Sequence, residues 1–226
     1  MGEQILSDER SVPGVQPERK QQQRSVVTQQ KLLDAALEAF SENGFKGTST
    51  RDIADRAGVH HPLITYHFKN KDQLWRAATD RIFREFNISL VKAMAEVEDT
   101  DARARAKAFV RTYVRYSRNQ PALHKIILQE AGQQSDRLDW LVDNHLRPLF
   151  QEVNKGIVEL QALGIAPPGN PALLFNMIRV SAGGLIALKQ ELKGTSGIDL
   201  DDDDEIDELA ELIIRVFFPG DALAVN

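Results

Sequence analysis

Residues 48–72 read TSTRDIADRAGVHHPLITYHFKNKD, and they contain two short helix patterns separated by one glycine. Ser49 and Asp52 have a spacing like that of a capping box, which predicts a helix that begins beside them. The glycine breaks this helix. A second helix is expected over residues 60–68, where Pro62 is tolerated in the first turn.

Helix patterns also flank this pair on both sides. The pattern over 28–42 ends at Asn43-Gly44, where the glycine can adopt a left-handed cap. Asn70 is a cap for a long helix over 71–98. Two short helices that are joined by a tight glycine turn and braced by neighbouring helices form a helix-turn-helix candidate, whose second helix would enter the major groove of DNA. The residues expected in its core are Ile53, Ala54, Ala57, Ile64 and Phe68.

The rest of the chain continues the helical pattern, and no segment alternates as a strand does. We expect five more helices, with a kink at Pro148 inside the third of them, over residues 101–118, 121–131, 135–163, 171–193 and 203–218. The fold class is therefore all-α. Three parts are predicted: a disordered leader over 1–25, a helix-turn-helix domain over 26–70, and a larger helical domain over 71–226.

Composition excludes several classes of protein. The chain has 226 residues, 42% of them hydrophobic and 27% charged, and no cysteine. This rules out disulfides, thiolate zinc sites and cysteine catalysis. There is no apolar run of membrane-spanning length, no secretory signal, and no cofactor, metal or nucleophile motif. We therefore expect a cytoplasmic protein that is not an enzyme, has no cofactor or metal, and does not contact a membrane.

The charge is unevenly distributed. Residues 19–71 hold nine Lys or Arg and five Asp or Glu, which gives this segment a net charge of +4. The rest of the chain has a net charge of −9, so the whole chain has −5. A basic segment joined to an acidic body would attract phosphates at one end only.

The segment over 26–78, with the turn Phe40-Ser41-Glu42-Asn43-Gly44-Phe45, closely resembles the DNA-binding region of the tetracycline-repressor (TetR) family of bacterial transcriptional regulators. The resemblance implies a sequence-specific regulator, a repressor, that binds double-stranded operator DNA. Phosphate contacts are implied for Thr50, Tyr66, His67 and Lys71, and base contacts for Arg51, His61, Pro62 and Leu63. Thr65 belongs to the same DNA-binding surface, although the family often has an aromatic residue there. His60 likewise replaces a small capping residue.

The resemblance also implies a homodimer held by the last two helices, and a small-molecule effector of unknown identity bound among the middle helices. The residues expected at the dimer interface are Ile178, Leu185, Leu188, Leu209, Ile213 and Phe217. Those expected in the ligand pocket are Phe109, Tyr113, Tyr116, His124, Trp140, His145, Phe175, Asn176 and Met177. For both sets, the alternative is ordinary core packing within one subunit. The alternative function is a helical ligand-binding or enzymatic protein that has lost DNA recognition, which the residues at 60 and 65 suggest.

Overall fold

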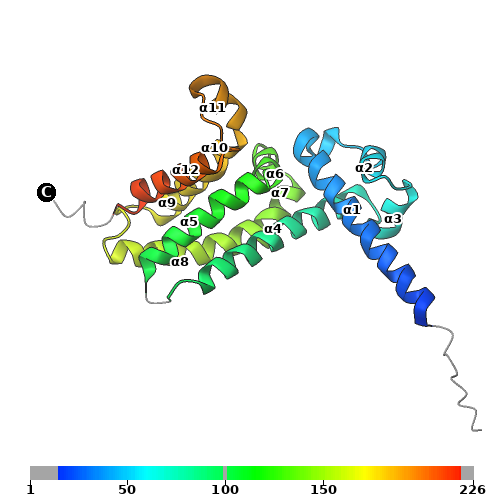
Figure 1. The fold of residues 1–226 in the computed structure, drawn as a ribbon, viewed down its shortest axis with the longest axis horizontal. Helices are drawn as coiled ribbons and strands as arrows, with labels where there is room; N and C mark the ends of the chain where they lie inside the picture. The colour runs from blue at the N-terminus through cyan, green and yellow to red at the C-terminus, as the bar shows by residue number, and fades with distance from the viewer. Residues whose placement is uncertain (1–14, 99–100, 220–226) are drawn as a thin grey trace, which may run out of the picture.

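The computed structural model describes residues 15–98 and 101–219, and this part of the chain is helical without strands (Figure 1). The N-terminal lobe consists of α1 (Val15–Gly47), α2 (Thr50–Ala57) and α3 (Pro62–Phe68). A long helix, α4 (Lys71–Ala95), runs from this lobe into the body, where it lies along α5 and α8 (Figure 1). The all-α fold class predicted from the sequence is confirmed.

The body is built from shorter helices and two π-helical turns. In chain order these are α5 (Ala102–Asn119), α6 (Ala122–Ala131), α7 (Asp136–Leu141), the π turn η1 (Val142–Leu146), α8 (Arg147–Ala162), α9 (Pro171–Arg179), the π turn η2 (Val180–Gly184), α10 (Leu185–Ala187), α11 (Lys189–Ser196) and α12 (Asp203–Phe217). In Figure 1, α6 and α7 lie where the body meets the N-terminal lobe.

The helix boundaries near residues 48–72 follow the predicted caps. The Ser49 side chain accepts a hydrogen bond from the Asp52 amide, and the Asn70 side chain accepts one from the Gln73 amide. Gly58 ends α2 in the left-handed region, with φ of 63°. Side-chain acceptors at helix starts satisfy amides that have no partner within the helix, which fixes where each helix begins.

The first helix begins earlier than predicted. Residues 15–25 belong to α1, although they were expected in a disordered leader, and the rest of that leader lies outside the described residues. The segment is rich in Gln, Arg and Lys, which have high helix propensity, and its one proline stands in the first turn, where helices tolerate it. Gly44 interrupts α1 with φ of 68°, where the left-handed cap was expected.

Two helices predicted to be continuous are divided. The helix over 135–163 contains the π turn η1 immediately before Pro148, which lacks the amide proton that a regular turn would use. The helix over 171–193 contains η2 and then breaks at Leu188, where the chain bends by 76° into α11. Within the described residues, no single helix combines the length and hydropathy of a membrane span; only the two segments on either side of this bend do so when taken together.

The hydrophobic core forms two clusters, and the boundary between them differs from the predicted domain boundary at residue 70. The first cluster joins α1–α4 to apolar side chains of α6 and α7, including Leu123, Ile126 and Leu141. The second fills the space between α5, α8, α9, η2 and α12. Helices α6 and α7 therefore pack on the N-terminal lobe although they belong to the body by sequence.

Candidate nucleic-acid interface and ligand cavity

Helix α3 presents a row of exposed side chains at its start and along its outer face. Ile64 and Phe68 are buried against the lobe, as predicted, while Tyr66 is 75% exposed. His61, Pro62 and Thr65 are also exposed, and Leu63 is half-buried. Because a large aromatic side chain is rarely left so open without a partner, this face is suited to contact another molecule.

The start of α2 lies next to the start of α3. The Thr50 hydroxyl and Nε2 of His61 are 2.9 Å apart, so these two predicted contacts lie close together on the surface. Arg51, one residue further, is exposed. A hydroxyl, an imidazole and a guanidinium are groups that bind phosphates and base edges.

His67 is half-buried beside Tyr66, with the two rings edge to face at 4.9 Å. Burial lowers the pKa of His67. The neutral imidazole is therefore favoured, and it can donate a hydrogen bond to a phosphate oxygen without contributing a charge.

Lys71 has internal partners in this structure. Its ammonium donates to the backbone carbonyls of Phe45 and Thr48 at 2.8 and 2.9 Å, and it lies 4.3 Å from the centre of the Phe45 ring. Burial and the nearby charge of Arg137 lower the pKa of Lys71. Only one of its three N–H donors is left for a phosphate, so Lys71 also ties the start of α4 to the turn between α1 and α2.

Two exposed cations near this surface were not among the predicted contacts. Lys46 stands at the end of α1, and Lys69 at the end of α3. Lys69 has a positive φ of 63°, which a residue with a side chain rarely adopts. Charge alone marks both residues in the sequence, but their place beside α2 and α3 follows from the fold.

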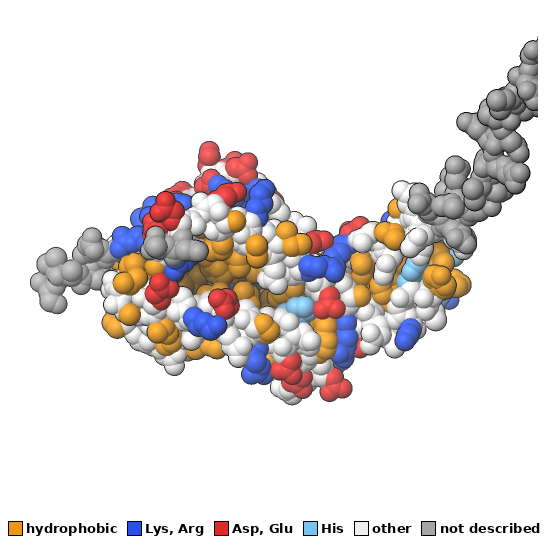
Figure 2. Space-filling view, turned by 90° about the horizontal axis from the view of Figure 1, so that it is seen from below, with side chains coloured by type: hydrophobic (Ala, Val, Ile, Leu, Met, Phe, Trp, Pro, Cys, Tyr) orange, Lys and Arg blue, Asp and Glu red, His pale blue; other side chains and the backbone are white. Residues whose placement is uncertain are grey.

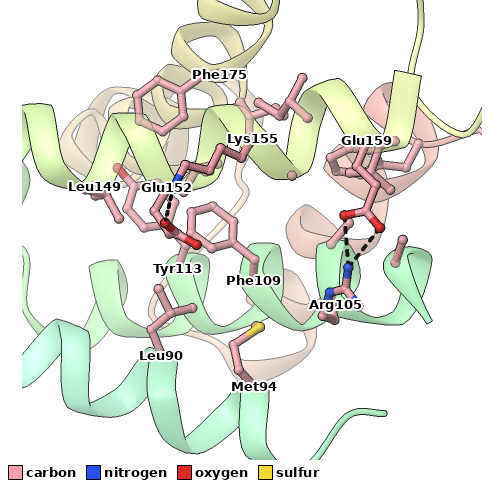
Figure 3. A pocket seen from close by; sticks show the side chains of 18 of the residues that line it. Leu90, Met94, Arg105, Phe109, Tyr113, Leu149, Glu152, Lys155, Glu159 and Phe175 are labelled. Carbon is pink, nitrogen blue, oxygen red and sulfur yellow. Dashed lines mark hydrogen bonds and ion pairs between the residues drawn. The ribbon is translucent and has the colours of Figure 1, made fainter. Parts of the chain in front are cut away.

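The body is hollowed on the face shown in Figure 2, and hydrophobic side chains gather in that hollow. A cavity of about 400 Å³ lies between α4, α5, α8 and α9 (Figure 3). This volume falls in the range of small-molecule sites. Its apolar wall is formed by side chains that include Leu90, Met94, Phe109, Leu149, Val153 and Phe175.

Three of the nine residues predicted for the ligand pocket lie in this wall: Phe109, Tyr113 and Phe175. The rings of Phe109 and Tyr113 stack at 5.9 Å, and Tyr113 is almost fully buried. Sequence reasoning missed the aliphatic part of the wall from α4 and α8, because aliphatic side chains at helical spacing are indistinguishable from ordinary core.

The other six predicted pocket residues lie elsewhere. Tyr116 donates to the Ile82 carbonyl at 2.8 Å, and His124 is buried at 2.6 Å from the Ser117 hydroxyl. Trp140 packs edge to face on Trp75 in the N-terminal core, and His145 binds Asp80 at 2.8 Å. The Asn176 amide donates to the Ala172 carbonyl, and Met177 points outward with 57% exposure. These six side chains do not line this cavity, and His145 instead lines a second surface hollow with Asp80 and Arg84 of α4.

The predicted dimer residues also need correction. Ile178, Leu209, Ile213 and Phe217 are buried in the core of the subunit, and Leu185 packs against that core. Leu188 is the one member of the set that is more than half exposed. A second apolar row faces outward on the same helices, each member at least half exposed: Leu173, Met177, Val180, Leu188, Leu212 and Val216. Helical periodicity reveals both rows but does not say which one faces the core.

An exposed helix-turn-helix on a helical body that holds a separate apolar cavity defines a class of protein, the DNA-binding regulators with a ligand-binding domain. The model of the family described as bacterial regulatory proteins, tetR family, matches residues 32–78. The HTH-type transcriptional regulator RutR of Escherichia coli strain K12 is 27% identical over 198 residues, which span 87% of this chain and 92% of RutR.

Two further similarities agree with this match. The class D tetracycline repressor protein of Escherichia coli is 31% identical over 90 residues, which span 40% of this chain and 41% of the repressor. Among solved structures, AibR in complex with isovaleryl coenzyme A and operator DNA has a TM-score of 0.69 at 14% identity, over 85% of this chain and 97% of AibR. These similarities confirm the resemblance to the tetR family of bacterial regulatory proteins that the sequence shows.

Proposed function

We propose that the protein is a dimeric, cytoplasmic transcriptional regulator, a repressor that a small molecule releases from its operator. The observation that carries the proposal is the exposed row on α3, from His61 to Tyr66, in the same chain as the body cavity. Among the relatives, RutR is named an HTH-type transcriptional regulator and the class D protein a tetracycline repressor.

In this proposal, α3 enters the major groove and α2 lies across the backbone. Arg51, His61, Pro62 and Leu63 face the bases, while Thr50, Thr65, Tyr66, His67 and Lys71 face phosphates. Pro62 and Leu63 have no polar side-chain atoms, so they can discriminate between bases only by apolar contact with thymine methyl groups. The geometry that supports these roles is the shared exposed surface of the two helix starts.

The dimer would form through the outward apolar row on α9, η2, α10 and α12. Its six large side chains lie on neighbouring elements and have no cover within the subunit. Burying them against a second copy removes apolar surface from water and pairs two helix-turn-helix units. Two such units read half-sites spaced by about one turn of DNA, roughly 34 Å.

Coupling between cavity and DNA would pass through α6 and α7. On the lobe side, the Gln129 side chain donates to the Ser41 carbonyl of α1 at 2.9 Å. Arg137 of α7 lies 3.9 Å from the centre of the Phe45 ring and pairs with buried Glu130 at 3.1 Å. On the cavity side, Tyr113 of the cavity wall packs edge to face on His124 of α6 at 5.3 Å. A ligand that displaces Tyr113 would therefore act on the helix that holds α1.

The test is binding to duplex DNA from the promoter region of its own gene, measured by fluorescence anisotropy over a series of salt concentrations. A specific sequence should bind more tightly than scrambled DNA, and the affinity should fall linearly with log salt, with a slope of about −0.9 for each phosphate contacted. Equal binding to specific and scrambled DNA would favour the alternative, a ligand-binding protein that does not recognise DNA.

A further inference from the structure

The cavity has three cations in its wall, and two of them are already neutralised. Arg105 donates from Nη2 to both oxygens of Glu159, at 3.2 and 3.0 Å, and Lys155 donates to Glu152 at 3.2 Å (Figure 3). The Arg105–Glu159 pair is partly buried, whereas the Lys155–Glu152 pair is exposed to solvent. They leave no net charge for a ligand to neutralise.

Arg179 is the exception. Among the residues that the structure describes, no carboxylate lies within 4.0 Å of its guanidinium; Nε and Nη2 donate only to the Asn176 amide oxygen, at 3.4 and 3.2 Å. The side chain is half-buried at the cavity wall. A partly desolvated guanidinium is stabilised by a carboxylate, which it can bind through two parallel N–H donors.

A second polar group in the same wall also has no partner. Tyr113 is 4% exposed, and within the described part of the chain its hydroxyl makes no hydrogen bond. The hydroxyl is therefore free to donate to a molecule in the cavity. Burial raises the pKa of Tyr113, so the phenol stays protonated as a donor, and Tyr113 and Arg179 line the same cavity.

We propose that the effector is a straight-chain aliphatic carboxylate whose chain fills the apolar cavity and whose head group binds Arg179 and Tyr113. This inference rests on the proposed function, because it names the ligand class of the same regulator. One unpaired cation fits a single negative charge. The several phosphate charges of a coenzyme thioester would need more cations than this wall leaves free.

The experiment measures binding to the full-length protein by isothermal titration calorimetry. The probes are straight-chain carboxylates from hexanoate to tetradecanoate, together with decan-1-ol and decanoyl-coenzyme A. We expect one member of the carboxylate series to bind at least tenfold more tightly than the alcohol of matched length and than the thioester. Equal binding of acid and alcohol, tighter binding of the thioester, or no binding by any carboxylate would overturn the proposal.

Variants locate the head group. Arg179→Gln should reduce the preference for acid over alcohol to about twofold or less, and Tyr113→Phe should reduce it several-fold. The double variant Arg105→Gln, Glu159→Gln removes an ion pair of the same wall without changing its net charge, so it should keep the full preference. A full preference in Arg179→Gln, or its loss in the double variant instead, would refute the assigned head-group site. Tyr113→Phe removes only the hydroxyl, and Arg179→Gln breaks no ion pair among the described residues, so a thermal melt suffices to verify their folding.

Operator binding by the unliganded wild-type protein is measured in parallel. Selective DNA binding without any carboxylate binding would leave the proposed function intact and remove the inference. Carboxylate binding that depends on Arg179, without DNA recognition, would do the reverse.

Discussion

Gly183 lies against the buried imidazole of His124, and this contact makes a sharp prediction. A Cβ added at residue 183 would lie 2.0 Å from Cε1 of His124, 2.2 Å from Nδ1 and 2.3 Å from Nε2. The ring has little freedom to move, because it is 3% exposed, bound to Ser117 at 2.6 Å and packed on Tyr113. Gly183→Ala must therefore shift either η2 or α6.

Overpacking a filled core costs about 1–3 kcal/mol, and removing a glycine from the unfolded chain returns about 0.4–1 kcal/mol. We expect a net loss of about 1–2 kcal/mol in the free energy of unfolding, which lowers the melting temperature by roughly 2–8 °C in a chain of this length. Urea unfolding followed by circular dichroism measures the free energy directly.

Gly194→Ala is the matched control, since a Cβ at that position in α11 meets no atom within 4 Å. It should leave stability unchanged or raise it by up to about 1 kcal/mol. His124→Ala should relieve the clash, so the double variant should be more stable than the two single effects predict when added together. If Gly183→Ala proved as benign as Gly194→Ala, the ring would not be fixed, and the coupling proposed through α6 would lose its support.

Three further predictions follow from other parts of the molecule. Lys69→Gly removes a positive-φ side chain and one cation, so stability should hold or rise while DNA affinity falls for all sequences and its salt slope drops by about 1; an unchanged slope would place Lys69 away from phosphate. Burial lowers the pKa of His124 from 6.5 to about 4, so between these pH values the unfolded chain binds a proton that the folded chain does not. The free energy of unfolding should therefore be highest above pH 6.5 and fall by at most about 1.4 kcal/mol per pH unit down to pH 4. Denaturant unfolding of His124→Gln over the same pH range should lack this decrease. Val216→Lys should convert the dimer to a folded monomer, which sedimentation velocity measures. Leu163→Lys, at a similarly exposed residue at the end of α8, should leave the dimer intact. A dimer that survives Val216→Lys would place the interface elsewhere.

The helix-turn-helix could be predicted from the sequence because its signals are local. Ser49 and Asn70 each cap their own helix by accepting from the amide three residues further along, and Gly58 ends α2 by its own backbone conformation. Such interactions depend on spacing along the chain, which the sequence gives directly. The buried positions of α2 and α3 follow from the same short period.

The cavity could be predicted only in part, because its wall depends on contacts between distant segments. Trp140 and His145 stand on the helix run that also supplies Leu149, yet η1 inserts an extra residue into the turn before Pro148 and so changes which face points inward. Helical periodicity cannot anticipate a π turn, since the pattern on each side remains regular. Periodicity likewise shows two apolar rows on α9 and α12 without saying which one faces the core.

The proposed head-group site and the proposed coupling path meet at His124. Arg179 stands immediately before η2, and burial together with its charge lowers the pKa of His124. Gly183 of η2 lies against the His124 ring and leaves it no clearance. A carboxylate that draws Arg179 or Tyr113 toward itself would therefore change the packing of a ring that cannot shift alone, and the displacement would have to pass to α6. Because α6 shares its apolar core with α1–α4, that displacement would reach the helices that carry the DNA-reading surface instead of being absorbed within the body.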